Sequence, residues 1–521
     1  MRHRLLALAV FVTVLPQLPA RAQIAPAFEA ADWSVPQTEL DARVRAALEA
    51  EGLQPAHPCS DAVFLRRAYV DVIGTLPEPE ETRRFLEETA ADKRARLIEA
   101  LLGRDEFAHY WTLRWCDLLR VKAEFPVNLW PNAVQAYHRF IYVAMRDNRR
   151  YDEFVRELLT SSGSNFRVPA VNFYRGLQGR EPQAIAEAVA LTFMGTRLAS
   201  WDEGRRADMA AFFSRLGYKK TGEWKEEIVY PELEAVAPFA GALPDGSPVT
   251  LAPDDDPRVA FADWLLGADN PWFARNAVNR IWSWLLGRGI IHEPDDIRPD
   301  NPPSNPALLA YLEKELVASG YDLRHIYRVI LNSRTYQQSF IPRSDGPRVA
   351  ALFGAYPLRR HDAEVLADAL SWVAGRGEGY VSPIPEPFTY IPAEQRTIAL
   401  ADGSITSSFL EMFGRPPRDT GLQAERNLEP SDAQALYLLN SSDVQRAIQR
   451  SPRLRAIARR AMGDRTRLIR ETYLLLLSRY PTTTEEDAAR MYWETPETAP
   501  DAAARDLAWA LINSTEFLYR H

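Results

Sequence analysis

The residues best suited to chemistry are two adjacent acids, Asp295 and Asp296, in a loop that prolines hold rigid. Paired carboxylates can act as general acid and general base in glycosidic-bond cleavage when the two groups face each other across the bond. Adjacent loop residues usually point apart, however, and acids before a proline-rich turn often cap it or pair with an arginine. The pattern therefore allows a catalytic role or a structural role for this pair.

His325 is the third candidate for acid–base catalysis, because imidazole titrates near neutral pH and this residue precedes the phrase 333–336 by about two helical turns. A histidine satisfied within the core is the alternative. The histidines show neither HxxxH nor HExxH spacing, and no CxxC, GxSxG, GxGxxG or P-loop motif occurs. The sequence therefore predicts no metal and no cofactor, and it supports neither a hydrolase nucleophile nor a nucleotide site.

Five residues on two predicted helices are candidates for ligand binding: Asn279, Arg280, Trp282, Arg334 and Tyr336. Guanidinium groups make bidentate contacts to carboxylates and sulfates, and aromatic rings can stack on sugar rings. The alternative is an internal arginine–aspartate network, for instance Arg280 with Asp296, because buried arginines are normally paired.

Helical periodicity runs through most of the chain and must position these residues. An apolar-periodic helix is predicted over 272–286, ended by Gly287 and Gly289. Further helices are predicted over residues 39–51, 61–73, 80–88, 92–102, 137–148, 151–160, 182–194, 306–319 and 323–332. The best of the few strand-like runs are 227–230 and 249–251. The predicted fold class is therefore mainly α, with little β.

We expect two helical domains, residues 32–216 and 256–521, joined by an irregular Pro- and Gly-rich segment, 217–255. A second irregular stretch, 375–402, carries four prolines and is predicted to form a long surface loop.

The two ends of the chain share one phrase, which reads as a helix, a proline-bearing turn and a second helix. Residues 65–81 align with residues 469–486, so that Tyr69 matches Tyr473 and Pro77 matches Pro481. We expect both ends to use the same helical packing unit.

Residues 1–22 have the pattern of a signal peptide: two arginines, an apolar run and small residues before Gln23. The sequence therefore predicts a periplasmic or extracellular protein, and no later segment is apolar for long enough to span a bilayer. The formal net charge is −8, and we find no basic cluster. Nucleic acid is therefore not an expected partner, because phosphate neutralisation supplies most of that affinity.

The chain has two cysteines, Cys59 and Cys116. In an oxidising compartment they could form a disulfide that stabilises the fold. Two separate buried thiols are the alternative, since sequence spacing says nothing about geometry.

Long phrases of this chain resemble two families found together in secreted bacterial proteins. CSDAVFLRRAYVDVIGTLPEPEE and DKRARLIEALLGRDEFAHYWTLRWCDLLR resemble DUF1549, the planctomycete cytochrome-like domain 2. FADWLLGADNPWFARNAVNRIWSWLLGRGI, GYDLRHIYRVILNSRTYQQS and FGRPPRDTGLQAERNLEPSDAQALYLLNSSDV resemble DUF1553, or planctomycete PSD1. The resemblance covers most of the chain and implies no established activity.

Two departures from the family pattern concern cofactors. Relatives usually carry CxxCH shortly after a phrase like 193–198, where this chain has Ala199-Ser200-Trp201-Asp202-Glu203. A cysteine-bearing phrase common in relatives is also missing at 419–426. The resemblance therefore implies that this member is a non-haem variant, which has lost one redox or metal-dependent unit.

The family association, often beside DUF1501 sulfatase-like proteins, implies a role in extracytoplasmic turnover of complex, sulfated carbohydrate. A carbohydrate ligand and a DUF1501-type protein are the partners it suggests. The alternative is a non-catalytic binding or scaffold protein of the cell envelope, which the missing cysteines and the scarce histidines favour.

Overall fold

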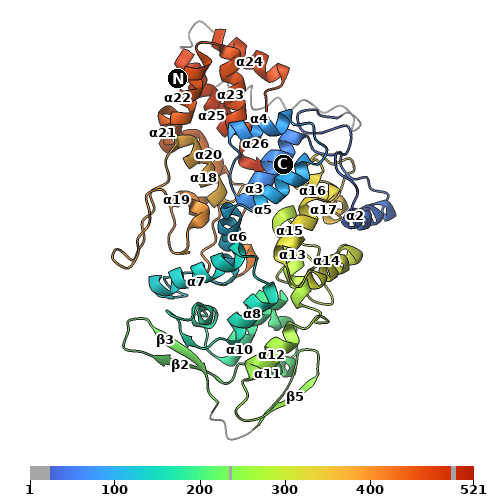
Figure 1. Ribbon diagram of the computed structural model, residues 1–521, viewed down its shortest axis with the longest axis vertical. Helices are drawn as coiled ribbons and strands as arrows, with labels where there is room; N and C mark the ends of the chain where they lie inside the picture. Colours follow the sequence, from blue (N-terminus) through green and yellow to red (C-terminus); the bar gives the residue numbers. More distant parts are fainter. Residues whose placement is uncertain (1–23, 234–237, 495–499) are drawn as a thin grey trace.

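The computed structural model describes residues 24–233, 238–494 and 500–521 (Figure 1). The predicted signal peptide, residues 1–22, lies outside the described residues. The described chain is mainly α-helical, as the periodicity predicts, and its strands form only small sheets.

The first half of the chain is built from short helices, most of which match the predicted ranges; the helix predicted over 137–148 starts earlier, at Trp130, and those at 105–118, 172–175 and 203–211 were not among the predicted ones. They are α2 (Glu39–Ala50), α3 (Asp61–Ile73), α4 (Pro79–Glu87), α5 (Lys93–Leu102), α6 (Asp105–Leu118), α7 (Trp130–Arg146), α8 (Tyr151–Thr160), α9 (Asn172–Arg175), α10 (Pro182–Val189) and α11 (Glu203–Ala211). A π-helical turn, Ala190–Met194, extends α10, and short 3-10 turns lie at Pro169–Val171 and Leu198–Ser200.

The second half of the chain is also built mainly from short helices. Its helices are α12 (Pro257–Leu265), α13 (Phe273–Leu286), α14 (Pro306–Ala318), α15 (Leu323–Leu331), α16 (Arg334–Gln337), α17 (Pro347–Ala351), α18 (Ala363–Ala374), α19 (Ser408–Met412), α20 (Asp432–Asn440), α21 (Ser442–Arg450), α22 (Pro452–Ala461), α23 (Arg465–Leu477), α24 (Thr483–Glu494), α25 (Pro500–Ile512) and α26 (Thr515–Leu518). Further 3-10 turns lie at Thr397–Ala399 and Gln423–Glu425.

Local sequence explains where these helices begin and end. The Ser60 hydroxyl accepts a hydrogen bond from the Val63 N–H and so caps α3, and Gly74 ends the helix at φ 61°. Gly287 ends α13 in the same left-handed conformation, at φ 70°, which confirms the predicted stop. The loop that carries the candidate acids therefore starts where the sequence predicts.

Two hairpins occupy the segment predicted to join the domains. Strands β2 (Leu216–Lys220) and β3 (Glu227–Pro231) pair antiparallel, and β3 also pairs with β1 (Gly163–Ser164). Strands β4 (Phe239–Ala242) and β5 (Pro248–Leu251) form the second hairpin. The two predicted strand-like runs are thus confirmed, and each has a partner that the alternation pattern did not reveal.

The repeated phrases at the two ends of the chain fold alike and lie together. α3 and α4 correspond to α23 and α24, and Figure 1 shows the blue pair beside the red pair. Arg66 of α3 donates at 2.8 Å to the Leu476 carbonyl at the end of α23. Arg67 donates at 2.9 Å to the carbonyl of His521. The helix α3 is therefore buried between the C-terminal helices and the rest of the molecule.

The C-terminal end is tied into the middle of the chain by a short pair of strands, β6 (Arg359–Arg360) and β7 (Tyr519–Arg520). One contiguous cluster of buried apolar side chains extends from Leu40 to Phe517. Among the described residues, every helix is too short or too polar to cross a membrane.

Candidate functional site

The loop after α13 is anchored by a buried ion pair between Arg280 and Asp295. An Nη1–Oδ1 distance of 2.7 Å joins them, and both side chains are fully buried. The second carboxylate oxygen of Asp295 accepts a hydrogen bond from the Gln423 backbone N–H at 2.7 Å. Arg280 also donates to Oδ1 of Asn276 at 2.9 Å and to the Leu191 carbonyl at 2.8 Å. Asp295 therefore has no face open to solvent with which to meet a substrate.

Asp296 points away from this pair and is partly exposed. Its carboxylate lies 3.1 Å from Nε of Arg298. The structure thus contains the arginine–aspartate network weighed as the alternative, with Asp295 as its acid in place of Asp296. Neighbouring loop residues face opposite ways here, so only one of them can reach Arg280.

His325 belongs to a third set of contacts, on α15. Its Nε2 lies 2.8 Å from Oε2 of Glu315 on α14, and each side chain is 31% exposed. Its backbone N–H donates the capping hydrogen bond to the Asp322 carboxylate at 2.9 Å. The three candidate catalytic residues thus have separate partners, and no contact among the described residues joins His325 to either aspartate.

Arg280 is one of the five candidate ligand-binding residues, and three of the other four are also buried and stabilise the fold. Asn279 makes two 2.9 Å hydrogen bonds to the backbone of Ile291, which pins the loop to α13. Trp282 is fully buried and packs edge-on against Phe353. Tyr336 is fully buried and donates to a carboxylate, described below. None of the three presents a surface to a ligand.

Arg334 is the member of this set that reaches solvent. Its Nε donates to the Val35 carbonyl at 3.1 Å, and its guanidinium lies 5.2 Å from the centre of the Trp33 ring. The pocket beside it holds about 180 Å³. Pockets for small ligands usually span about 300–1,000 Å³, so this one is small for that purpose.

The candidate disulfide is absent, which corrects the first of the two expectations for the cysteines. Cys59 and Cys116 are both free and fully buried. Cys59 lies beside Arg94 at the start of α3, whereas Cys116 is inside α6, and the charges that act on it are those of Arg418 and Asp117. Burial raises the pKa of Cys116 to about 12, so this thiol is inert at neutral pH.

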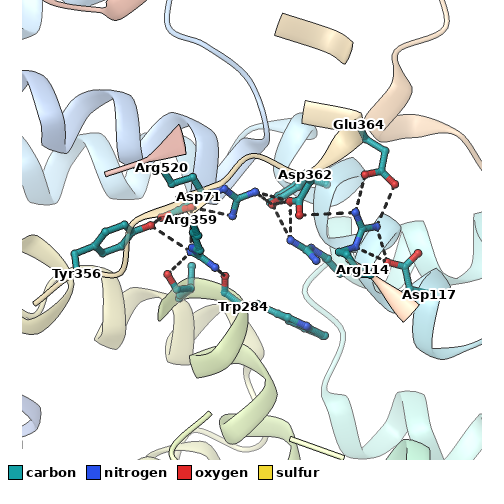
Figure 2. Close-up of polar contacts among 12 residues, drawn as sticks. Asp71, Arg114, Asp117, Trp284, Tyr356, Arg359, Asp362, Glu364 and Arg520 are labelled. Atoms are coloured by element: carbon teal, nitrogen blue, oxygen red, sulfur yellow. Dashed lines mark hydrogen bonds and ion pairs between the residues drawn. The ribbon is translucent and has the colours of Figure 1, made fainter. Parts of the chain in front are cut away.

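A buried network of acids and arginines forms the largest polar feature of the interior (Figure 2). Asp71 on α3 accepts hydrogen bonds from the Tyr336 and Tyr356 hydroxyls, at 3.0 and 2.7 Å, and pairs with Arg520 at 3.1 Å. Arg520 also binds Asp362.

The network continues towards α6 and the loop after α19. Arg114 lies 2.6 Å from Asp362, and Arg426 bridges Asp117 and Glu364 at 2.7 and 2.6 Å. These groups tie the first and second halves of the chain together. They are buried and bonded to one another, and they line neither the pocket beside Arg334 nor the one between α18 and α21, so we assign the network a structural role.

Two segments far apart in the sequence, the π-helical turn at 190–194 and the loop 419–426, meet at the Arg280–Asp295 pair. Leu191, in the π-helical turn shortly before residue 199, accepts from Arg280, and Gln423, in the loop 419–426, donates to Asp295. Arg120 also joins the two segments, because it donates to the Thr420 carbonyl at 2.8 Å and to Thr192 at 3.4 Å. These hydrogen bonds join α13, the π-helical turn and the loop 419–426.

One feature that the sequence analysis did not single out is a group of three aromatic rings, here called the aromatic surface: Trp130, Trp224 and Phe388. Trp224 is 69% exposed and Phe388 is 52% exposed, whereas Trp130 is half-buried. The Trp130 ring contacts both of the others, at 5.5 Å from the ring of Phe388 and 6.5 Å from that of Trp224.

The aromatic surface comes from three separate segments. Trp130 begins α7, Trp224 lies in the turn between β2 and β3, and Phe388 lies in the loop after α18; Figure 1 shows these elements along one side of the molecule. Trp130 has φ 69°, a left-handed conformation that costs a bulky residue on the order of 1 kcal/mol.

Comparison with known families identifies the chain. Residues 39–200 match the family model PSCyt2, protein of unknown function (DUF1549), and residues 257–493 match PSD1, protein of unknown function (DUF1553). The protein therefore belongs to the DUF1549/DUF1553 family, as its phrases predict, and it lacks the CxxCH motif. No curated protein and no solved structure matches it.

The matches end at residue 200 and resume at residue 257, so the segment between them contains β2 to β5. Among the described residues, no group of three or more histidines, cysteines or acids is arranged to hold a metal ion. The family itself assigns no activity to the chain.

Proposed function

We propose that this protein is a non-catalytic carbohydrate-binding protein of the cell envelope, which serves polysaccharide turnover by holding a glycan rather than by cleaving it. The aromatic surface is the observation that carries the proposal. Its location outside the cytoplasm rests on the predicted signal peptide, and association with a DUF1501-type protein stays a prediction.

The chemistry of the aromatic surface suits sugar rings. The C–H face of a pyranose is apolar and packs on the flat face of an aromatic ring, and large rigid rings lose little conformational entropy on binding. Trp224 and Phe388 meet Trp130 at interplanar angles of 84° and 59°. The three rings therefore face different directions, as a branched or bent chain of sugars requires.

Polar groups beside the rings can satisfy sugar hydroxyls. Lys225 lies 5.6 Å from the centre of the Trp224 ring, and exposed Glu223 precedes that tryptophan. A contact surface made of aromatic and hydrogen-bonding residues together is also how small-molecule sites fix orientation.

The candidate acids argue against a hydrolase. Glycosidases need two carboxyl groups that face each other, about 5 Å apart in retaining enzymes and about 6.5–9.5 Å apart in inverting ones. Asp295 is sealed against Arg280 and Asp296 is paired with Arg298, so neither supplies such a group.

A glycan array with the mature protein tests this proposal. We expect binding to a defined set of glycans, and a loss of about three- to tenfold in affinity in Trp224→Ala and again in Phe388→Ala, because each ring contact is worth about 0.5–1.5 kcal/mol. The matched control is Met462→Ala, which removes a side chain that is 85% exposed, between α22 and α23. If the protein binds no glycan, or if Trp224→Ala binds as the unchanged protein does, the proposal fails.

A further inference from the structure

A second candidate site is a pocket of about 500 Å³ between α18, α20 and α21. One wall is a face of α18, with Leu370, Ser371 and Ala374, and the opposite wall is α21, with Val444 and Ala447. Helical spacing of three and four residues puts each set on one side of its helix. The volume lies in the range of small-molecule sites.

Rings and a glycine-rich turn complete this pocket. Phe409 of α19 and Tyr437 of α20 contribute aromatic rings that lie 5.8 Å apart. The segment 376–379, which follows α18, forms part of the rim and has glycines at 377 and 379. Glycines leave backbone N–H and C=O groups open to a ligand.

The charged side chains that line the pocket are three arginines, Arg376, Arg446 and Arg450, and two acids, Glu378 and Asp443, so positive charge is in excess. Arg446 lies beside Asp443, with which it forms an ion pair, whereas the guanidinium groups of Arg376 and Arg450 have no ion pair or hydrogen bond with any residue that the structure describes. Both side chains are exposed. Two unpaired guanidiniums beside an apolar wall can bind a sulfate or carboxylate group through charge-assisted hydrogen bonds.

A basic segment, residues 446–470, runs from the second half of α21 through α22 into α23, and it corrects the statement that the chain has no basic cluster. Between residues 446 and 470 there are nine arginines and one acid, Asp464, in a protein whose net charge is −8. Of these arginines, Arg446, Arg453, Arg460 and Arg470 form ion pairs. The remaining ones make the local potential positive, which raises the concentration of anions near the pocket.

We infer that this pocket binds an acidic sugar: a ring that carries a sulfate ester or a carboxylate. The anionic group meets Arg376 and Arg450, and the ring packs against Phe409 and Tyr437. Ring hydroxyls can donate to the exposed carboxylate of Asp443. The ligand class agrees with the proposed function, but the inference rests on different residues and does not need the aromatic surface.

The same loop serves both sites. Its beginning, at 376–379, lines the pocket, and Phe388 further along belongs to the aromatic surface. A glycan with one acidic residue could therefore contact both sites, although each can be tested alone.

Calorimetric titration with galactose 6-sulfate, glucuronic acid, neutral galactose and inorganic sulfate tests the inference. We expect at least one acidic sugar to bind tenfold or more tightly than galactose and than inorganic sulfate, with an affinity that falls as salt rises from 50 to 300 mM. Equal binding of neutral and acidic sugars, or binding of inorganic sulfate as tight as that of the sugars, overturns it.

Variants locate the binding. The double variant Arg376→Gln/Arg450→Gln should weaken binding at least tenfold, and Ala447→Phe should block it by filling the pocket while leaving every arginine in place. The matched control Arg459→Gln removes an exposed charge of α22 that is outside the pocket lining and should bind as the unchanged protein does. Retained binding in Ala447→Phe contradicts the inference. Trp224→Ala should leave this binding unchanged, so failure here and failure of the proposed function are distinguishable.

Discussion

The loop after α13 and the pocket beside α21 contain the same kinds of residue in opposite situations. In the loop, Arg280 and Asp295 are fully buried and satisfy each other. At the pocket, Arg376 and Arg450 face solvent without a partner among the described residues. The comparison teaches that a dense cluster of tryptophans, arginines and acids in a sequence can indicate a buried structural contact, whereas solvent-exposed groups without a partner can lie in another part of the chain.

The largest expected effect concerns two adjacent acids of that loop. Asp295→Ala removes the partner of a buried arginine, and leaving such a charge unpaired costs about 3–5 kcal/mol. Asp296→Ala breaks a partly exposed pair and should cost less than about 1 kcal/mol. Urea unfolding of both variants measures the difference. If the free energy of unfolding falls by a similar amount in both variants, the two acids do not differ in their structural importance.

The second effect is a dependence of stability on pH from buried histidines. Burial lowers the pKa of His521 to about 4, and burial with the charges of Arg66 and Arg520 lowers the pKa of His361 well below its usual range. An unfolded histidine has a pKa near 6.5, so between about pH 6.5 and pH 4 the unfolded chain binds protons that the folded chain rejects. The free energy of unfolding should therefore fall as the pH falls through this range.

The size of that effect can be checked with one substitution. A shift of about 2.5 pKa units at His521 corresponds to about 3 kcal/mol. Urea unfolding at pH 7 and at pH 4 measures this difference. Between these two pH values, the free energy of unfolding of His521→Gln should fall by on the order of 2 kcal/mol less than that of the unchanged protein. An equal loss in the two proteins would mean that His521 is not held neutral by the fold.

A smaller effect is expected at His325. Its pair with Glu315 is partly exposed, and ion pairs of this kind contribute about 0.2–1 kcal/mol. His325→Ala should therefore lower the free energy of unfolding by less than about 1 kcal/mol and leave glycan binding unchanged. If the variant keeps its stability but no longer binds glycan, His325 contributes to ligand binding.

The smallest effect on stability should come from the pocket itself. Arg450→Gln removes a charge without a partner, and surface substitutions of this kind usually change stability by less than about 0.5 kcal/mol. Thermal unfolding measures it. A large loss of thermal stability would mean that Arg450, like Arg280, stabilises the fold, and the two regions would then not differ.

The sequence was sufficient for most of the helices because each depends on local signals. Apolar residues at helical spacing define α3 and α8 to the residue, and Gly287 ends α13 as predicted. Strand β2 was missed because its sequence, LGYKK, is mostly solvent-facing and does not alternate cleanly. Its position depends on pairing with β3, which no local pattern records.

The candidate site was harder to predict because its contacts join distant parts of the chain. Sequence reasoning expected an arginine–aspartate pair as one alternative, but the choice of Asp295 over Asp296 depends on the Gln423 N–H, contributed by a loop far along the chain. The pocket likewise combines residues of α18, α19, α20 and α21. The arginines between 446 and 470 were visible in the sequence and could have directed attention there.

Glycan binding by two variants tests the central claim, that ligand recognition lies away from the conspicuous loop. Asp296→Ala/His325→Ala changes two partly exposed groups and should fold normally, so the account predicts that it binds glycans with the affinity of the unchanged protein while Trp224→Ala loses about three- to tenfold. A well-folded Asp296→Ala/His325→Ala protein that no longer binds, beside a Trp224→Ala protein that does, would contradict the account.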